Sequence, residues 1–344
     1  MSTHAEAPTS VAGVTQMTYR QAIAAAIIDE MAADESVILM GEDVGASGGV
    51  FKTNEGVIER FGAGRVLNTP ICENGFLGVA LGMAVTGLRP VVEIMFSDFL
   101  PSAGDAIVNE LPKFRFMSGG QCTVPITVRA IGGGTGRFGT QHSATGESWY
   151  LQLPGLKVAA ASSPSAVYGL LRAAIREDDP VLLFEHKGLL ARKGPVVRDP
   201  TSIAKVGRAV VRRSGGDVTV VASLLMCDRA LTAAEQVAAD HGIQTEVVDM
   251  QWLRPMDFDT VEASLRRTGR LIVAEEQVHL AGWGATVISE MAKRGVPFSK
   301  PPRAISLPDD TLIPYSPTLE DEVIPSAEAS GAAIRAVCGL EVGA

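Results

Sequence analysis

The chain has 344 residues, a hydrophobic content of 46% and a formal net charge of −9. This length allows about two domains with sizeable cores. The acidic balance, with its basic residues dispersed, argues against nucleic-acid binding, and no apolar run reaches the roughly 20 residues that a membrane span needs.

The first half of the chain alternates short β-branched runs with longer helical patterns. Residues 1–16 contain no Lys or Arg, and we expect a disordered leader there rather than a targeting signal. We expect strands at 36–40, 65–69, 90–95, 125–130, 157–161 and 181–185, and helices at 74–86, 102–116 and 165–177. This alternation is typical of a mostly parallel sheet covered by helices.

The pattern lapses between Lys187 and Lys205, where prolines and mixed charges predict a linker, which we place at 191–210. Strands are expected again at 217–222, 244–248 and 271–275, with helices beginning at Leu225, Asp257 and Gly284. The sequence therefore predicts an α/β protein with two domains, residues 17–190 and 211–344, each a mostly parallel sheet flanked by helices.

The four cysteines lie at positions 72, 122, 227 and 338, without C-x-x-C or metal-ligand spacing. We interpret them as buried thiols of a reducing compartment, and we expect a cytoplasmic protein.

The stretch IGGGTGRFGTQHS, residues 131–143, contains G-x-G-x-x-G at Gly134, Gly136 and Gly139. A dinucleotide fingerprint opens directly into a helix and is followed by an acidic residue at the end of the next strand. Here a polar, glycine-interrupted segment follows, and the next predicted strand ends in serines. We therefore favour a mobile loop that carries His142, and a nicotinamide-dependent oxidoreductase is the alternative from another class.

Residues 68–99 place a glycine-rich helix directly behind Glu73. Glycine inside a helix costs about 1 kcal/mol relative to alanine, so this composition favours the close approach of another helix, from this chain or from a partner. Glu73 is either an ordinary acid at a helix N-terminus or a carboxyl in an apolar cleft, where a raised pKa lets it share a proton with a ligand nitrogen.

Six segments together resemble one family. They are GEDVG (41–45), NTPICE (68–73), DAIVNELPKFRFMSGG (105–120), TQHS (140–143), PGLKV (154–158) and LRPMDFDT (253–260). Over residues 17–337 the chain resembles the beta subunit of the thiamine-diphosphate-dependent component of 2-oxo acid dehydrogenase complexes. The resemblance implies a pyrimidine-binding domain followed by a transketolase C-terminal-like domain.

Relatives in this family act on pyruvate, branched-chain 2-oxo acids or acetoin. The segment FEHKGLLARKG (184–194) is more similar to branched-chain and acetoin members. The resemblance therefore implies a 2-oxo acid dehydrogenase subunit, with an acetoin-cleaving enzyme as the alternative within the family.

The resemblance also implies an alpha-2 beta-2 heterotetramer. In it, the beta subunit holds the aminopyrimidine of thiamine diphosphate, and the alpha subunit holds the diphosphate and its Mg²⁺. The alpha-type signature begins with GDG, which this chain lacks. The chain would then carry half an active site and would transfer its acyl product to a lipoyl-bearing acyltransferase core.

By the same resemblance, Glu73 and His142 are the catalytic residues. The Glu73 carboxyl would bond to a pyrimidine nitrogen, and His142 would stand at the mouth of the site. The positions matching the cofactor pocket are Glu42, Ile71, Glu73, Met95 and Phe99. A scaffold subunit without catalytic residues is a further alternative, which the presence of Glu73 and His142 disfavours.

Some members hold a structural K⁺, largely through backbone carbonyls. The matching positions are Ile126, Ala174, Ile175, Glu177 and Asp179. The family more often has Asp and Asn at the last two, so the ion is either retained with altered ligands or lost.

Overall fold

A seven-stranded sheet organises the first domain in the computed structural model, which describes residues 13–340. Its order is β12-β6-β7-β5-β4-β2-β3, and every neighbouring pair is parallel except β12 with β6. The strands are β2 (Val37–Gly41), β3 (Val66–Asn68), β4 (Arg89–Ile94), β5 (Thr127–Gly132), β6 (Lys157–Ala160), β7 (Val181–His186) and β12 (Trp252–Arg254). Strands β2 and β7 are buried along their whole length, as parallel strands covered on both faces should be.

Helices cover both faces of this sheet. On one face, α1 (Tyr19–Ala33) packs against α6 (Pro164–Arg176), and Thr18 begins α1 with a capping box while Ser163 caps α6. On the other face lie α3 (Glu73–Val85) and α4 (Leu111–Met117). Shorter elements are α2 (Val57–Phe61), η1 (Ser97–Ala103), the π-helical η2 (Ala106–Glu110), η3 (Thr140–His142), α5 (Glu147–Tyr150) and η4 (Lys187–Leu189).

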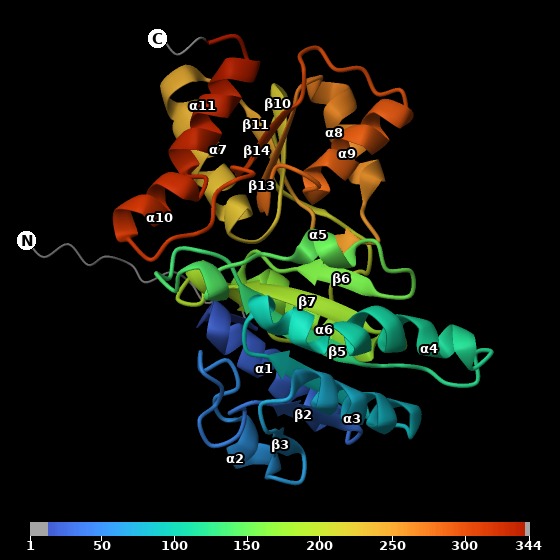
Figure 1. Ribbon diagram of the computed structural model, residues 1–344. Coiled ribbons are helices and arrows are strands. Elements are labelled where there is room, and N and C mark those ends of the chain that lie inside the picture. The colour runs from blue at the N-terminus through green and yellow to red at the C-terminus, as the bar shows by residue number, and fades with distance from the viewer. Residues whose placement is uncertain (1–12, 341–344) are drawn as a thin grey trace, which may run out of the picture.

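The second domain contains a five-stranded sheet of order β14-β13-β10-β11-β9, in which only β9 runs antiparallel to its neighbour. Figure 1 shows α7 and α11 on one side of it and α8 and α9 on the other. The elements are β9 (Val210–Arg213), β10 (Val218–Ala222), α7 (Leu224–His241), β11 (Thr245–Asp249), α8 (Phe258–Thr268), β13 (Leu271–Val278), α9 (Trp283–Lys293), β14 (Arg303–Leu307), α10 (Pro317–Val323) and α11 (Ala327–Val337). The predicted fold class is therefore confirmed.

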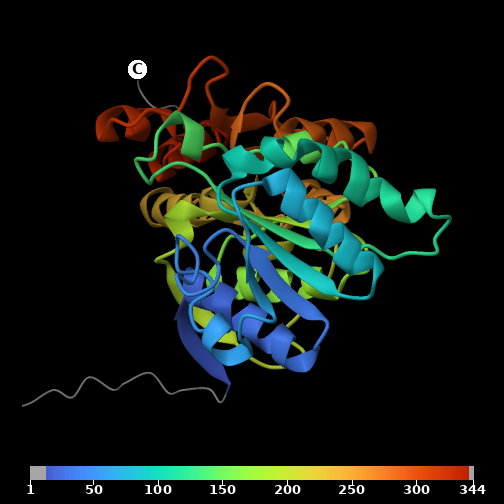
Figure 2. The ribbon, with the colours of Figure 1, turned by 60° about the horizontal axis from the view of Figure 1, so that its bottom comes forward.

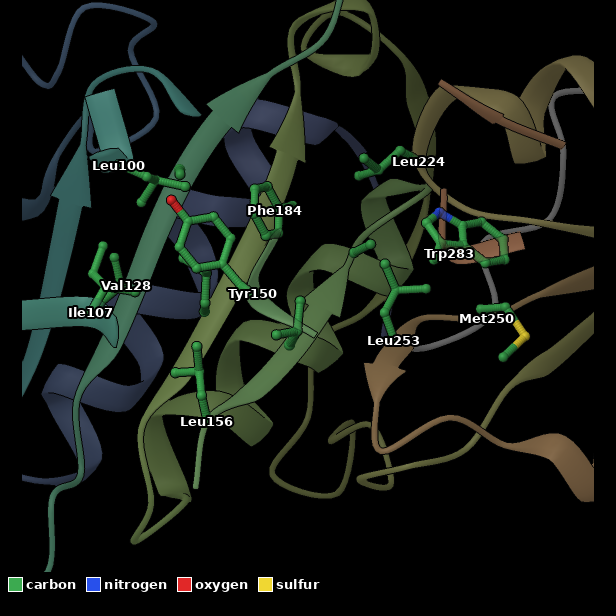
Figure 3. Close-up of a cluster of buried hydrophobic side chains, with 14 of the residues drawn as sticks. Leu100, Ile107, Val128, Tyr150, Leu156, Phe184, Leu224, Met250, Leu253 and Trp283 are labelled. Atoms are coloured by element: carbon green, nitrogen blue, oxygen red, sulfur yellow. The ribbon is translucent and has the colours of Figure 1, made fainter. Parts of the chain in front are cut away.

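The two domains share one hydrophobic core. Tyr150 and Phe184 of the first domain belong to the same buried cluster as Leu224, Leu253 and Trp283 (Figure 3). In addition, β12 follows the second domain's β11 in the chain but joins the first domain's sheet. The domains are thus held at a fixed junction rather than by a simple linker.

Several predicted boundaries differ from the structure. Residues 14–16 of the expected leader belong to β1 (Val14–Thr18), which pairs antiparallel with β8 (Lys193–Val197) inside the expected linker; residues 1–12 lie outside the described part. The helix predicted at 102–116 lies within one continuous helical run, which begins earlier than predicted and changes from 3-10 in η1 to π in η2 and α in α4; Pro112 lacks the N–H that an α-helical bond would need near the change from η2 to α4.

All four cysteines are free thiols, but only Cys227 is buried, and Cys72 is exposed. The prediction of buried thiols is therefore wrong for Cys72, which immediately precedes the N-terminus of α3. Within residues 13–340, no helix combines the length and apolarity that a membrane span requires.

Candidate active site

Four of the predicted site residues lie at one edge of the first sheet. Glu42 follows β2, Glu73 begins α3 after β3, Met95 follows β4, and His142 lies in the loop after β5. Because these strands are parallel neighbours, their carboxyl ends meet at the same edge, where ligands bind in open α/β sheets.

Two carboxyl groups interact at this edge. Burial, followed by the charges of Glu73 and Asp43, raises the pKa of Glu42, which is only 7% exposed. The Oε1 atom of Glu42 is buried and has no hydrogen-bond partner in the described structure. A buried carboxyl oxygen without a partner fits a ligand that brings its own donor.

The surroundings of Glu73 are more open than predicted. Phe76 and Leu77 belong to the core, but Cys72 is exposed and Ile71 is 84% exposed, while Glu73 itself is half-buried. The described residues of this chain therefore do not close the expected apolar cleft around Glu73. Figure 2 shows α3, in light blue, on the outer surface of the first domain.

Aromatic rings surround His142. The Phe96 ring lies 4.7 Å from the imidazole and 5.4 Å from the Phe99 ring, and Phe99 lies 5.4 Å from the imidazole, all edge-to-face. Met95, Phe99 and His142 are each half-buried. The arrangement gives His142 a fixed apolar support, while each of the three half-buried side chains keeps part of its surface exposed.

Glycines in the His142 loop allow close contact with the second domain. A Cβ atom at Gly134 would overlap Ile324, and one at Gly139, whose φ is +71°, would overlap the Tyr315 ring. The Gly134 N–H donates to Glu276 at 2.6 Å, and Thr140 donates to the carbonyl of Ile313 at 3.1 Å. Packing thus explains these glycines, and the motion of the loop stays a prediction.

A buried arginine joins three neighbouring strands below the site. Arg129 on β5 donates to Glu185 on β7 at 2.7 Å and to Glu93 on β4 at 2.9 Å. All three side chains are buried. Because breaking such a pair leaves an uncompensated buried charge, this network holds the strand ends that carry the site in fixed register.

The five positions that match a K⁺ site already have partners within this chain. The Lys157 ammonium lies 2.8 Å from Glu177 Oε2 and 2.9 Å from Asp179 Oδ2. Arg89 donates to the carbonyls of Ile175 and Glu177 at 3.1 and 2.9 Å. The carbonyls of Ala174 and Ile126 accept backbone N–H groups. The chain's own cation thus compensates the Glu177 and Asp179 carboxylates, and its own donors already bond to each of the four carbonyls.

Sequence reasoning missed three residues around His142, namely Phe96, Lys187 and Glu276. Glu276 lies in the second domain, far from His142 in sequence, yet accepts from the loop that carries it. A signal existed for Glu276, since LIVAEEQV places two adjacent acids inside a mostly apolar strand, and buried carboxylates need partners.

Comparisons with known proteins assign both domains to known families. The family models "Transketolase, pyrimidine binding domain" and "Transketolase, C-terminal domain" match residues 15–193 and 207–329. The mitochondrial pyruvate dehydrogenase E1 component subunit beta-2 of Oryza sativa subsp. japonica is 38% identical over 330 residues, which cover 95% of this chain and 88% of the relative. The chain belongs to the E1 beta-subunit family of 2-oxo acid dehydrogenases.

Other relatives agree with the assignment to the E1 beta family. The pyruvate dehydrogenase E1 component subunit beta of Rickettsia bellii (strain RML369-C) is 38% identical over 326 residues, which cover 95% of this chain and 100% of the relative. A solved structure described as a split gene transketolase, inactive beta4 tetramer, has a TM-score of 0.75 at 24% identity and covers 94% of this chain and 99% of that chain. This second match shows the shared fold.

Proposed function

We propose that this E1 beta-family chain is the beta subunit of a pyruvate dehydrogenase, and that it forms the aminopyrimidine half of a thiamine diphosphate site shared with an alpha subunit. The observation that carries the proposal is the buried, unpartnered Glu42 oxygen beside Glu73 at the carboxyl edge of the sheet. Pyruvate is favoured because the curated relatives named above are pyruvate dehydrogenase subunits. Branched-chain 2-oxo acids and acetoin are the alternatives within the family.

The residues at this edge suit the cofactor's heterocycle. When bound, thiamine diphosphate supplies the electron sink for loss of CO₂ from a 2-oxo acid. Glu73 would hold a ring nitrogen by a hydrogen bond and exchange a proton with it. Phe99, together with Met95 and Ile71, would provide an apolar surface for the ring.

Glu42 and His142 would hold or transfer protons next to that ring. Burial, and after it the charge of Glu73, raises the pKa of Glu42, which favours the protonated form of this carboxyl and lets it donate a hydrogen bond. The imidazole of His142 offers a hydrogen-bond donor and an acceptor, and its ring is held by Phe96 and Phe99. We propose that it orients the reacting group and serves transfer of the acyl product to a lipoyl acyltransferase.

An exposed helix face supports a shared site. A Cβ atom at Gly78 or Gly82 on α3 would meet no heavy atom within 4 Å, and Val79 is 53% exposed. A glycine-rich, apolar helix face open to solvent fits close packing against another chain. We propose that the alpha subunit covers this face and holds the diphosphate with its Mg²⁺. A cytoplasmic location stays a prediction.

The test is to assay the chain alone and together with the alpha subunit from its own source. Dye reduction would be measured with thiamine diphosphate, Mg²⁺ and each of pyruvate, a branched-chain 2-oxo acid and acetoin. We expect no activity from the chain alone and highest activity with pyruvate in the pair. Glu73→Gln should abolish that activity, whereas the matched control Glu59→Gln, on the exposed surface of α2, should not. Full activity from the chain alone, or from the Glu73→Gln pair, would overturn the proposal.

A further inference from the structure

Lys187 contacts the segment that carries His142 from inside the protein. It follows His186 at the start of η4 and is only 7% exposed. Its ammonium donates a hydrogen bond to the backbone carbonyl of His142. The contact fixes the main chain at the residue whose side chain faces the site.

Two phenyl rings flank the same ammonium. The Lys187 Nζ lies 4.6 Å from the centre of the Phe138 ring and 5.5 Å from that of Phe96. These are cation–π distances, and such contacts strengthen when the cation is desolvated. The Phe96 ring also lies 4.7 Å from the imidazole of His142. Lys187 therefore contacts His142 directly at its backbone carbonyl and indirectly, through Phe96, at its imidazole.

We propose that Lys187 is a positioning residue for His142, and that its charged ammonium holds the 133–146 loop in the arrangement the reaction needs. The proposal rests on the proposed function, because it assigns His142 a role in that reaction. Packing alone does not explain why this buried position carries a cation, since an unbranched apolar side chain would fill the same space.

The charges facing Lys187 come from four elements. Asp98 on η1, Glu276 on β13 and Glu320 on α10 favour its charged form, and His142 on η3 accepts its hydrogen bond through the backbone carbonyl. Glu320 is already paired with Arg137 and Glu276 with His186, and Arg229 on α7 also lies near both of these carboxylates.

Burial outweighs these carboxylates and lowers the pKa of Lys187 to about 8. The charged donor makes the stronger hydrogen bond, and a cation–π contact requires the charge. Activity should therefore fall as the pH rises through about 8, where the ammonium loses its proton.

Because the pKa of Lys187 is lowered, a positioning role and a structural role predict different effects of removing its charge on protein stability. The folded protein disfavours the charged form of Lys187 relative to water, so removing the charge should not lower the unfolding midpoint. A variant that is as stable as the wild type but slower is the signature of positioning.

The test uses the assembled alpha–beta enzyme with Lys187→Met and Lys187→Arg, and with Lys205→Met at an exposed lysine as the matched control. We expect Lys187→Met to lower kcat about 10- to 100-fold, as misplacement of a catalytic group does, while KM and the Kd of thiamine diphosphate change by less than about twofold. Its residual activity should lack the decline near pH 8. Lys187→Arg keeps its charge, so its decline should move to higher pH.

Amide hydrogen exchange of residues 133–146, corrected for intrinsic rates, provides a readout without activity. We expect faster exchange in Lys187→Met than in the wild type and no change in Lys205→Met. An unchanged kcat, an unchanged alkaline decline in both Lys187 variants, or unchanged exchange would each overturn the proposal. If Lys187→Met does not fold, the pH profile of Lys187→Arg decides. If the wild-type pair shows no activity with any substrate, the proposed function fails, and the exchange experiment still tests the role of Lys187.

Discussion

The ring of His186 donates a hydrogen bond to the carboxylate of Glu276 at 3.0 Å, and both side chains are buried. His186 ends β7 of the first domain, and Glu276 lies on β13 of the second. The Nδ1 atom of His186 accepts from the Gly188 N–H at 3.0 Å, which leaves Nε2 as the donor to Glu276. Since Glu276 also accepts from Gly134, one carboxylate joins the second domain to the base of the His142 loop.

Glu276→Ala should destabilise the chain. Burial alone would raise the pKa of Glu276, but His186, the Gly134 N–H and Arg229 outweigh burial and hold this pKa below its ordinary value. Removing the carboxylate leaves two buried donors unpaired, which should cost about 2–4 kcal/mol of unfolding free energy. Urea denaturation measures this loss, with Glu59→Ala as an exposed control expected within about 0.5 kcal/mol of the wild type. A cost below about 1 kcal/mol would show that the pair does not hold the domains together.

Glu147→Gln should change how stability depends on pH. Burial, with smaller contributions from Glu276 and Glu275, raises the pKa of Glu147 to about 8. The folded chain therefore binds this proton more tightly than the unfolded chain, so its contribution to stability is complete below about pH 4.5 and is lost as the pH rises to 8. The difference in unfolding free energy between wild type and variant should change by up to about 1.4 kcal/mol per pH unit in this window. A constant difference from pH 5 to 8 would contradict the buried, protonated state.

Gly78→Leu should stabilise the isolated chain but weaken its pairing. The position is helical and faces open space, so leucine should add up to about 1 kcal/mol to the unfolding free energy. The same side chain would obstruct a tightly packed partner and should raise the Kd for the alpha subunit at least about tenfold, or 1.4 kcal/mol. Ala263→Leu on the exposed face of α8 is the control. Equal affinity of wild type and Gly78→Leu, measured by sedimentation, would place the alpha subunit elsewhere.

K⁺ should not stabilise the chain specifically. Lys157 and Arg89 already satisfy the oxygens of the loop at residues 175–179. An ion that binds the folded chain and is present at 100 times its Kd would add about 2.7 kcal/mol to the unfolding free energy. It would also raise the unfolding midpoint by several degrees. We expect equal midpoints in KCl, NaCl and choline chloride at the same ionic strength. A midpoint raised only in KCl would show that the ion is retained with altered ligands.

The position of a candidate site residue could be predicted from the sequence where that residue directly follows a strand. Glu42, Met95 and His142 each come after a parallel strand, so strand prediction alone brings them to one edge. Their roles came from the family resemblance, because an exposed Ile71 and a half-buried Glu73 do not form a pocket within this chain.

Contacts between distant segments could not be predicted in the same way. The pairing of β1 with β8, and of Glu276 with Gly134, depends on how the domains meet rather than on any local pattern. Helix α1 escaped prediction because its apolar residues lie on most sides and leave little amphipathic periodicity. The Lys187 contact needs both the end of β7 and the folded His142 loop, which periodicity does not position.

We propose that this chain carries half of a decarboxylating active site and that its alpha subunit carries the other half. The most direct measurement is the rate of CO₂ release from pyruvate while the chain is titrated into a fixed amount of its alpha subunit, with thiamine diphosphate and Mg²⁺ present. We expect no CO₂ release from either chain alone, a rate that saturates at equal amounts of the two chains, and no release with Glu73→Gln at any ratio. CO₂ release by this chain without an alpha subunit, or the same saturating rate with Glu73→Gln as with the wild type, would contradict the shared site.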